Sequence, residues 1–259
     1  MTPQVVAHRG ASFSNPEHTL RAYLEAISEG ADALECDVRL TADGHLVCVH
    51  DRDLRRTAAN RGLVSTMELA DLGQLEFASW KNPWADLDDE APDRSGEGDG
   101  VLTLRRLLET VADSGRRVEV AIETKHPTRY AGLVERRLVE TLRDFGWHRP
   151  GGPVRVMSFS AVSLQRMQRL APGVPRVMLI DKTTSWPRLA PLLGDDWILG
   201  PGIKLLTKHP KRARRLARTG RDLHVWTVNT QDQLELCLEL GAKAIITDRP
   251  AYVRGLLGV

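Results

Sequence analysis

The chain has few cysteines and no long hydrophobic run. Its 259 residues include three cysteines, Cys36, Cys48 and Cys237, and none of them belongs to a CxxC pair. A set this sparse and odd in number argues against a disulfide framework and for a reducing compartment. No apolar run approaches the roughly eighteen residues of a membrane span, so we expect no stable membrane insertion.

The chain also has almost no excess of charge. Its 36 basic and 34 acidic residues leave a formal net charge of +2. Domains that bind nucleic acid are usually strongly basic, so we expect no nucleic-acid partner, and an anionic ligand must be recognised locally. The first residues, Met1-Thr2-Pro3-Gln4, lack the basic and apolar regions of a signal peptide. We therefore expect a cytoplasmic protein.

Strand patterns alternate with helix patterns along most of the chain. A strand at Gln4 to His8, a helix that ends at Gly30 and a strand at Ala33 to Leu40 form a βαβ unit. The alternation resumes at Val101, which predicts a parallel sheet covered by helices. Nine candidate strands exceed the eight of an α/β barrel. We therefore expect that one of the nine is not a strand or lies outside the barrel. Trp197 to Ile203, which contains Gly-Pro-Gly, has the weakest strand pattern.

One connection is too short for a helix and predicts a hairpin. Asp43-Gly44 separates two alternating apolar runs, which is the usual signal of a two-residue turn. With this turn, Asp37 faces His50 across the hairpin at roughly 5 Å between Cβ atoms. Glu35 shares a face with Asp37, because side chains alternate along a strand. The three side chains are thus predicted to converge, and a shift of one residue would remove that pairing.

The segment from Arg52 to Gly100 is irregular. It contains a helical fragment at Ser65 to Leu75 and an acidic, glycine-rich stretch at Leu87 to Gly100, the best candidate for disorder. A connection this long in a compact domain is usually functional or mobile. We interpret it as a cap or small subdomain.

Five ionisable residues lie within or at the ends of predicted strands: His8, Glu35, Asp37, His50 and Glu123. Active sites of α/β barrels are built from such strand ends. The three carboxylates form an oxygen donor set that suits Mg²⁺ or Ca²⁺ better than Zn²⁺. The two histidines suit general acid and base work near neutral pH.

Two cations lie next to these residues in the sequence. Several of the candidate residues can also have a purely structural role. Arg9 and Lys125 can hold phosphate oxygens. Glu35 and Asp37 can instead pair with an arginine such as Arg39, although a buried carboxylate without a partner is rare. The basic stretch from Lys208 to Arg221 is typical of a solvated helix face.

Short motifs follow one another in a fixed order along nearly the whole chain. They are His8-Arg9-Gly10, 15–19 (Asn-Pro-Glu-His-Thr), 35–38 (Glu-Cys-Asp-Val), 41–44 (Thr-Ala-Asp-Gly), 49–51 (Val-His-Asp), 102–104 (Leu-Thr-Leu), 123–125 (Glu-Thr-Lys), 158–160 (Ser-Phe-Ser), 226–229 (Trp-Thr-Val-Asn) and 246–250 (Ile-Thr-Asp-Arg-Pro). This ordered set resembles the glycerophosphodiester phosphodiesterase family.

The resemblance implies a fold and a site. The fold is an α/β TIM-like (β/α)8 barrel of the phosphodiesterase type, one domain over residues 1–259, with an insertion or cap at 52–100 after the third strand. The implied roles are an acid–base pair (His8, His50), ligands of a divalent metal, Mg²⁺ or Ca²⁺ (Glu35, Asp37, Glu123), phosphate binding (Arg9, Lys125) and pocket lining (Glu17, Trp226).

The implied activity is hydrolysis of a small-molecule glycerophosphodiester to glycerol 3-phosphate and an alcohol. Two alternatives stay open at this point. One is a lysophospholipase D-type lipid phosphodiesterase, and the other is a non-catalytic phosphate-binding barrel, since one fold can host unrelated functions. The sequence leaves open the head group, the metal, the nucleophile, which histidine is the acid, and the oligomeric state.

Overall fold

The computed structural model describes residues 2–81, 99–181 and 189–259. Within these ranges the chain forms nine strands that belong to one sheet. The strands are β1 (Gln4–His8), β2 (Ala33–Leu40), β3 (Leu46–Cys48), β4 (Glu119–Thr124), β5 (Val154–Ser158), β6 (Arg176–Ile180), β7 (Ile198–Pro201), β8 (His224–Val225) and β9 (Ala244–Thr247).

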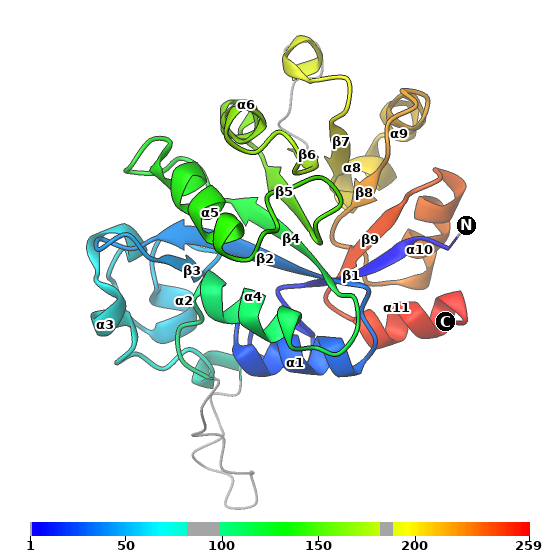
Figure 1. The fold of residues 1–259 in the computed structure, drawn as a ribbon. Coiled ribbons are helices and arrows are strands. Elements are labelled where there is room, and N and C mark those ends of the chain that lie inside the picture. Colours follow the sequence, from blue (N-terminus) through cyan, green and yellow to red (C-terminus); the bar gives the residue numbers. More distant parts are fainter. Residues whose placement is uncertain (1, 82–98, 182–188) are drawn as a thin grey trace, which may run out of the picture.

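Eight of these strands form a nearly closed parallel barrel (Figure 1). Hydrogen-bonded neighbours follow the order β7-β6-β5-β4-β2-β1-β9-β8. The two ends of this order meet through parallel bridges from Leu199 to Leu223 and from Gly202 to Trp226. The predicted α/β barrel is therefore confirmed, and the segment that begins at Trp197 supplies a barrel strand, β7.

The ninth strand, β3, lies outside the barrel order and pairs antiparallel with β2. The predicted hairpin is present, but its predicted register is wrong by one residue. Leu40 pairs with Leu46, where the two-residue turn required Val47. Asp37 consequently does not face His50 across the ladder.

The turn of the hairpin accounts for the shift. Gly44 has a left-handed backbone with φ of +88°. The N–H of His45 donates to the Thr41 hydroxyl, and the N–H of Thr41 donates to the carbonyl of His45. The loop therefore has three residues, 42–44, with glycine at the left-handed position, which is the second common hairpin type. An Asp-Gly pair is compatible with both types.

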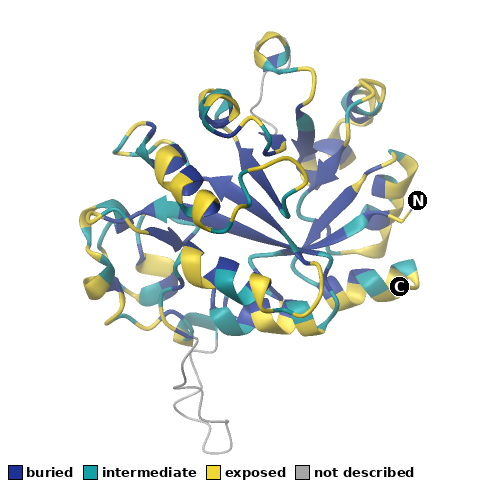
Figure 2. Cartoon of the chain, in the orientation of Figure 1, coloured by how far each residue is buried: buried dark blue, intermediate teal, exposed yellow. Residues whose placement is uncertain are grey.

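Helices cover the outside of the barrel (Figures 1 and 2). Four of them begin at a hydroxyl that accepts a hydrogen bond from the N–H three residues later, at Thr19, Thr103, Ser160 and Thr230. The α-helices of the described ranges are α1 (Leu20–Ser28), α2 (Arg55–Ala58), α3 (Leu69–Leu72), α4 (Leu104–Ala112), α5 (Leu133–Asp144), α6 (Ala161–Leu170), α8 (Ile203–Lys208), α9 (Pro210–Ala217), α10 (Gln231–Glu239) and α11 (Pro250–Leu257). None of the helices in these ranges combines the length and the apolarity needed to cross a membrane.

Strand alternation separates two buried layers. In β2, Leu34 and Cys36 belong to the apolar cluster between the strands and the helices, whereas Ala33 belongs to the cluster inside the barrel. Because neighbouring side chains of a strand point to opposite faces, Glu35 and Asp37 point into the barrel with Ala33. The same pattern that builds the core therefore aims these two carboxylates at the barrel interior.

The segment after β3 packs around a third apolar cluster, which includes Val47, Leu54 and Phe77. The helical fragment predicted from Ser65 to Leu75 is confirmed only in part. A 3₁₀ turn, η1 (Val64–Thr66), and the short helix α3 are separated by extended backbone at residues 67 and 68.

The two other predictions for this segment are not tested. The stretch predicted to be disordered, 87–100, lies outside the described residues except for 99 and 100. The interpretation of 52–100 as a cap on a single domain stays a prediction.

Candidate active site

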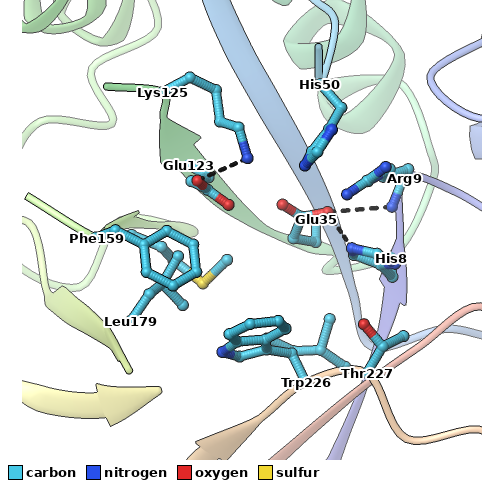
Figure 3. Close-up of a pocket in the computed structure, with 12 residues that line it drawn as sticks. His8, Arg9, Glu35, His50, Glu123, Lys125, Phe159, Leu179, Trp226 and Thr227 are labelled. Atoms are coloured by element: carbon cyan, nitrogen blue, oxygen red, sulfur yellow. Dashed lines mark hydrogen bonds and ion pairs between the residues drawn. The ribbon is translucent and has the colours of Figure 1, made fainter. Parts of the chain in front are cut away.

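A cavity of about 240 Å³ lies at the carboxyl ends of the barrel strands (Figure 3). Parallel strands bring these ends to one rim, so residues that are far apart in the sequence meet there. The lining consists of His8, Arg9, Glu35, His50, Glu123, Lys125, Met157, Phe159, Leu179, Trp226, Thr227 and Ile246.

Three buried carboxylates meet at this rim, among the residues that the structure describes. Glu35 and Asp37 come from β2 and Glu123 from β4, and the parallel register pairs Asp37 directly with Glu123. One oxygen of each lies within 4.8 Å of the others, and the residues are 1 %, 0 % and 7 % exposed. Burial, followed by repulsion from Asp37, raises the pKa of Glu123 to about 8 and that of Glu35 well above its usual range. Such an oxygen set fits Mg²⁺ or Ca²⁺, whose charge would offset the repulsion.

Two cations, Lys125 and Arg9, share the cavity with the carboxylates (Figure 3). Lys125 Nζ lies 2.8 Å from Glu123 Oε1 and 3.1 Å from Asp37 Oδ1. Arg9 Nε lies 3.0 Å from Asp37 Oδ2, and the backbone N–H of Arg9 donates to Glu35 at 3.2 Å. Burial raises the pKa of Asp37, but the charges of Lys125 and Arg9 outweigh it and hold that pKa well below its usual range. The carboxylates thus fix both cations at the cavity wall.

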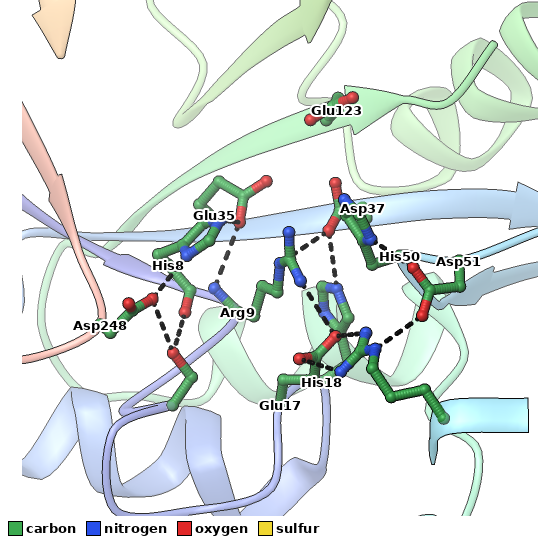
Figure 4. Close-up of polar contacts among 12 residues, drawn as sticks. His8, Arg9, Glu17, His18, Glu35, Asp37, His50, Asp51, Glu123 and Asp248 are labelled. Carbon is green, nitrogen blue, oxygen red and sulfur yellow. Dashed lines mark hydrogen bonds and ion pairs between the residues drawn. The ribbon is translucent and has the colours of Figure 1, made fainter. Parts of the chain in front are cut away.

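His8 is held by a carboxylate from the far end of the chain (Figure 4). Its Nδ1 lies 2.6 Å from Asp248 Oδ1, and Asp248 also accepts hydrogen bonds from Ser12 and Asn229. Burial raises the pKa of Asp248, but the hydrogen bond and the charge of His8 outweigh it, and the pKa is about 2. An ionised carboxylate can only accept a hydrogen bond, so Nδ1 of His8 carries the proton. The other ring nitrogen, Nε2, lies 4.0 Å from Glu35 Oε2.

His50 reaches the same cavity by a different route. It follows the end of β3, and the guanidinium of Arg39 donates to its carbonyl at 3.0 and 2.8 Å. Its Nδ1 lies 2.7 Å from Asp51 Oδ1, and Asp51 Oδ2 accepts from Arg56. Burial lowers the pKa of His50 to about 4. His50 therefore lines the cavity with Glu35 and Glu123 although the hairpin register differs from the predicted one. Because His50 lies beyond the last residue of β3, its position does not depend on the pairing of β3 with β2.

Glu17 is placed differently from the prediction. We expected it to line the pocket, but it is not among the side chains that do so. Its carboxylate accepts from Arg9 at 3.0 Å and from both terminal nitrogens of Arg56 at 2.7 and 2.8 Å. Glu17 therefore links the arginine of the cavity to an arginine of the segment after β3.

His18, to which the sequence assigned no role, is buried against Asp37. The residue is 5 % exposed, its Nε2 lies 2.9 Å from Asp37 Oδ2, and its Nδ1 lies 2.8 Å from the Tyr23 hydroxyl. It has a left-handed backbone with φ of +61°, as does Arg9 with +60°. Strained backbone of this kind is concentrated at functional sites.

Four residues that bind the predicted site residues were given no role from the sequence, although they belong to the ordered motifs. His18, Asp51, Asn229 and Asp248 lie in the motifs at 15–19, 49–51, 226–229 and 246–250. Their membership of these motifs was a usable signal. Ser12 and Arg56 carried none.

An apolar wall closes another side of the cavity (Figure 3). Trp226 and Phe159 meet edge to face, with ring centroids 5.5 Å apart at 88°. The indole N–H of Trp226 donates to the carbonyl of Gly200 at 2.7 Å, which fixes the ring. Leu179 completes this wall. The cavity therefore has a charged side and an apolar side.

A parallel barrel whose ionisable side chains gather at the carboxyl ends of its strands has the arrangement of an α/β-barrel enzyme. Comparison with known proteins narrows this class. The model of the glycerophosphoryl diester phosphodiesterase family matches residues 8–252. The chain belongs to this family.

Individual relatives of the chain carry names that agree with this family assignment. The probable glycerophosphodiester phosphodiesterase 1 of Mycobacterium tuberculosis is 43% identical over 98% of this chain and 92% of its own length. A glycerophosphodiester phosphodiesterase of Bacillus subtilis is 31% identical over 95% of this chain and 83% of its own. A phosphodiesterase of Oleispira antarctica, solved with the product sn-glycerol-3-phosphate, superposes with a TM-score of 0.83 at 26% identity, covering 99% and 97% of the two chains. The predicted family and enzyme class are confirmed.

Proposed function

We propose that the chain hydrolyses glycerophosphodiesters to glycerol 3-phosphate and an alcohol, with His8 and His50 as the acid–base pair. One observation carries the proposal. Both imidazoles line the same cavity and both bind an aspartate through Nδ1, Asp248 at 2.6 Å and Asp51 at 2.7 Å. A carboxylate at Nδ1 orients the ring and fixes its tautomer, so that Nε2 carries out the proton transfer.

Glu35, Asp37 and Glu123 would hold the divalent cation. When bound, an Mg²⁺ or Ca²⁺ ion supplies charge neutralisation for the phosphate and orients the substrate. Lys125 and Arg9 hold phosphate oxygens beside it, and the planar guanidinium of Arg9 can do so bidentately. Their ion pairs with the carboxylates keep both cations in place before substrate arrives.

The histidines then move two protons. One imidazole takes the proton of the nucleophile at Nε2, and the other donates its proton to the leaving alcohol. The nucleophile is water in a direct displacement, or the 2-hydroxyl of glycerol in a route through a cyclic phosphate. Detection of a cyclic glycerophosphate by phosphorus NMR during turnover distinguishes the second route from the first.

The apolar wall receives the carbon skeleton of one ester arm. Trp226 and Phe159 present ring surface to the cavity on the side away from the paired charges. A glycerol or an alcohol carbon chain packs against such surface.

The cytoplasmic location stays a prediction. The three cysteines are free and buried, which fits the reducing compartment expected from the sequence.

The experiment is a panel of glycerophosphodiesters in which release of glycerol 3-phosphate is coupled to its dehydrogenase. The protein is assayed after chelation and again with added Mg²⁺, Ca²⁺ or Mn²⁺. We expect no turnover after chelation and recovery with at least one ion. Activity on lysolipids without activity on glycerophosphocholine would replace the proposal by the lysophospholipase D alternative, and no turnover of any diester would favour the non-catalytic alternative.

A further inference from the structure

A second hollow lies next to the active site and shares Lys125 with it. Its lining contains four cations, Arg39, Arg52, Lys125 and Arg129, and no carboxylate among the described residues that form it. The first comes from β2, the second from the segment after β3, and the last two from the end of β4 and the loop that follows. We call this set of four residues the basic hollow.

The positive charge of the basic hollow is balanced by ion pairs only at Lys125, which lies 2.8 Å from Glu123 Oε1 and 3.1 Å from Asp37 Oδ1. Across residues 2–81, 99–181 and 189–259, no carboxylate forms an ion pair with Arg39, Arg52 or Arg129. Arg9 and Arg56 contrast with them, because both bind Glu17. A concave surface with charge of one sign concentrates ions of the opposite sign. The basic hollow therefore favours an anionic ligand.

Two parts of the wall of the basic hollow, Arg39 and the backbone at Ser65, are held in place before any ligand binds. Two nitrogens of Arg39 donate to the His50 carbonyl, which leaves the third nitrogen of its guanidinium for another acceptor. The hydroxyl of Tyr130 donates to the carbonyl of Ser65 at 2.8 Å and ties the segment after β3 to the region after β4. Binding to a preformed wall costs less conformational entropy.

We propose that the basic hollow is a second anion site, which binds a phosphate or carboxylate group on the alcohol portion of the substrate. This inference rests on the proposed function, because it places the scissile phosphate at Lys125. Lys125 lines both the active-site cavity and the basic hollow. Arg39, which also lines the basic hollow, donates to the carbonyl of the catalytic His50. An ester arm that extends from the scissile phosphate into the basic hollow therefore reaches Arg52 and Arg129. The enzyme thus prefers diesters whose alcohol carries a second negative charge.

The test compares three synthetic diesters that share the glycerophosphate half. Their alcohol portions are propyl, 2-carboxyethyl and 3-phosphopropyl, so they differ in the charge at the far end. The variants are Arg52→Gln, Arg129→Gln and the double variant, whose side chains are exposed and outside the catalytic cavity. Arg215→Gln, an exposed arginine of α9, is the matched control.

For the two charged esters we expect kcat/KM to fall about threefold in each single variant and about tenfold in the double variant, as for partly exposed ion pairs. The propyl ester should keep its kcat/KM in all of them, and the control should change nothing. The ester that loses more identifies the preferred anion. An equal loss on all three esters, or no loss on the charged ones, would overturn the second anion site.

A binding measurement separates this inference from the proposed function. The three esters are titrated calorimetrically into the chelated protein, where no turnover is expected. The charged esters should bind more tightly than the propyl ester, and the double variant should remove the difference. If the wild-type protein turns over no ester but shows this difference, the proposed function fails and the anion site stands. If it shows no difference, the anion site fails whatever the turnover.

Discussion

Nδ1 of His8 lies 2.6 Å from the carboxylate of Asp248, although 240 positions separate the two residues. The contact exists because β1 and β9 are neighbours in the barrel, with Ala7 paired to Thr247. His50 obtains the same kind of partner from the next residue, Asp51. One imidazole thus depends on closure of the barrel, and the other depends on a local turn.

The Asp248→Asn variant tests the first of these partners. Asparagine keeps the size of the side chain but loses the negative charge that selects the Nδ1–H tautomer of His8. We expect kcat to fall by roughly 10²- to 10⁴-fold, the usual contribution of an oriented acid or base. The assay is glycerol 3-phosphate release, with Asp222→Asn, at an exposed position, as the control. Wild-type kcat in Asp248→Asn would show that His8 does not need its partner.

The leaving group assigns the roles of His8 and His50. Replacement of either by alanine should lower kcat on a glycerophosphodiester of a simple alcohol by roughly 10² to 10⁴. A p-nitrophenyl ester needs little help from an acid, because its leaving group is a weak base. The variant that recovers activity on this ester has lost the acid, and the other has lost the base. Near-full activity of either variant on the simple ester would contradict the acid–base pair.

The sequence predicted those parts of the site that depend on local periodicity. Strand alternation placed Glu35 and Asp37 on one face, and the inner cluster confirms that face. The hairpin register was wrong because Asp-Gly fits a loop of two or three residues. Gly44 is left-handed in both loops, and the backbone at Asp43, which is not left-handed here, decides between them. Asp248 received no role, because its contact with His8 depends on which strands become neighbours, and periodicity carries no information about that.

Added metal should stabilise the folded protein through the three carboxylates. A ligand that binds only the native state raises the free energy of unfolding by about 2.7 kcal/mol at a hundredfold excess over its Kd. We expect the Tm of the chelated protein to rise with Mg²⁺ or Ca²⁺, and Glu123→Gln to lose most of that rise. Thermal unfolding monitored by circular dichroism measures it. An undiminished rise in Glu123→Gln would place the ion elsewhere.

A buried carboxylate of α5, which is not a member of this cluster, should make stability depend on pH. Glu135 is 0 % exposed, and its Oε1 lies 3.2 Å from His126 Nε2 and 3.4 Å from Arg166. Burial raises its pKa, but the interactions with His126 and Ser163 outweigh burial and lower the pKa from 4.5 to about 2. A pKa that is lower in the folded state stabilises that state above pH 4.5, and the contribution disappears as pH falls towards 2.

The Glu135→Gln variant should therefore unfold at a lower temperature than the wild type at pH 7, because it lacks the charge that its partners stabilise. The gap in Tm should narrow steadily as the pH falls below 4.5. Glu239→Gln, at an exposed position of α10, should match the wild type throughout. A gap that stays constant down to the lowest pH at which the protein folds would mean that shape and hydrogen bonding, and not the charge of Glu135, stabilise this part of the barrel.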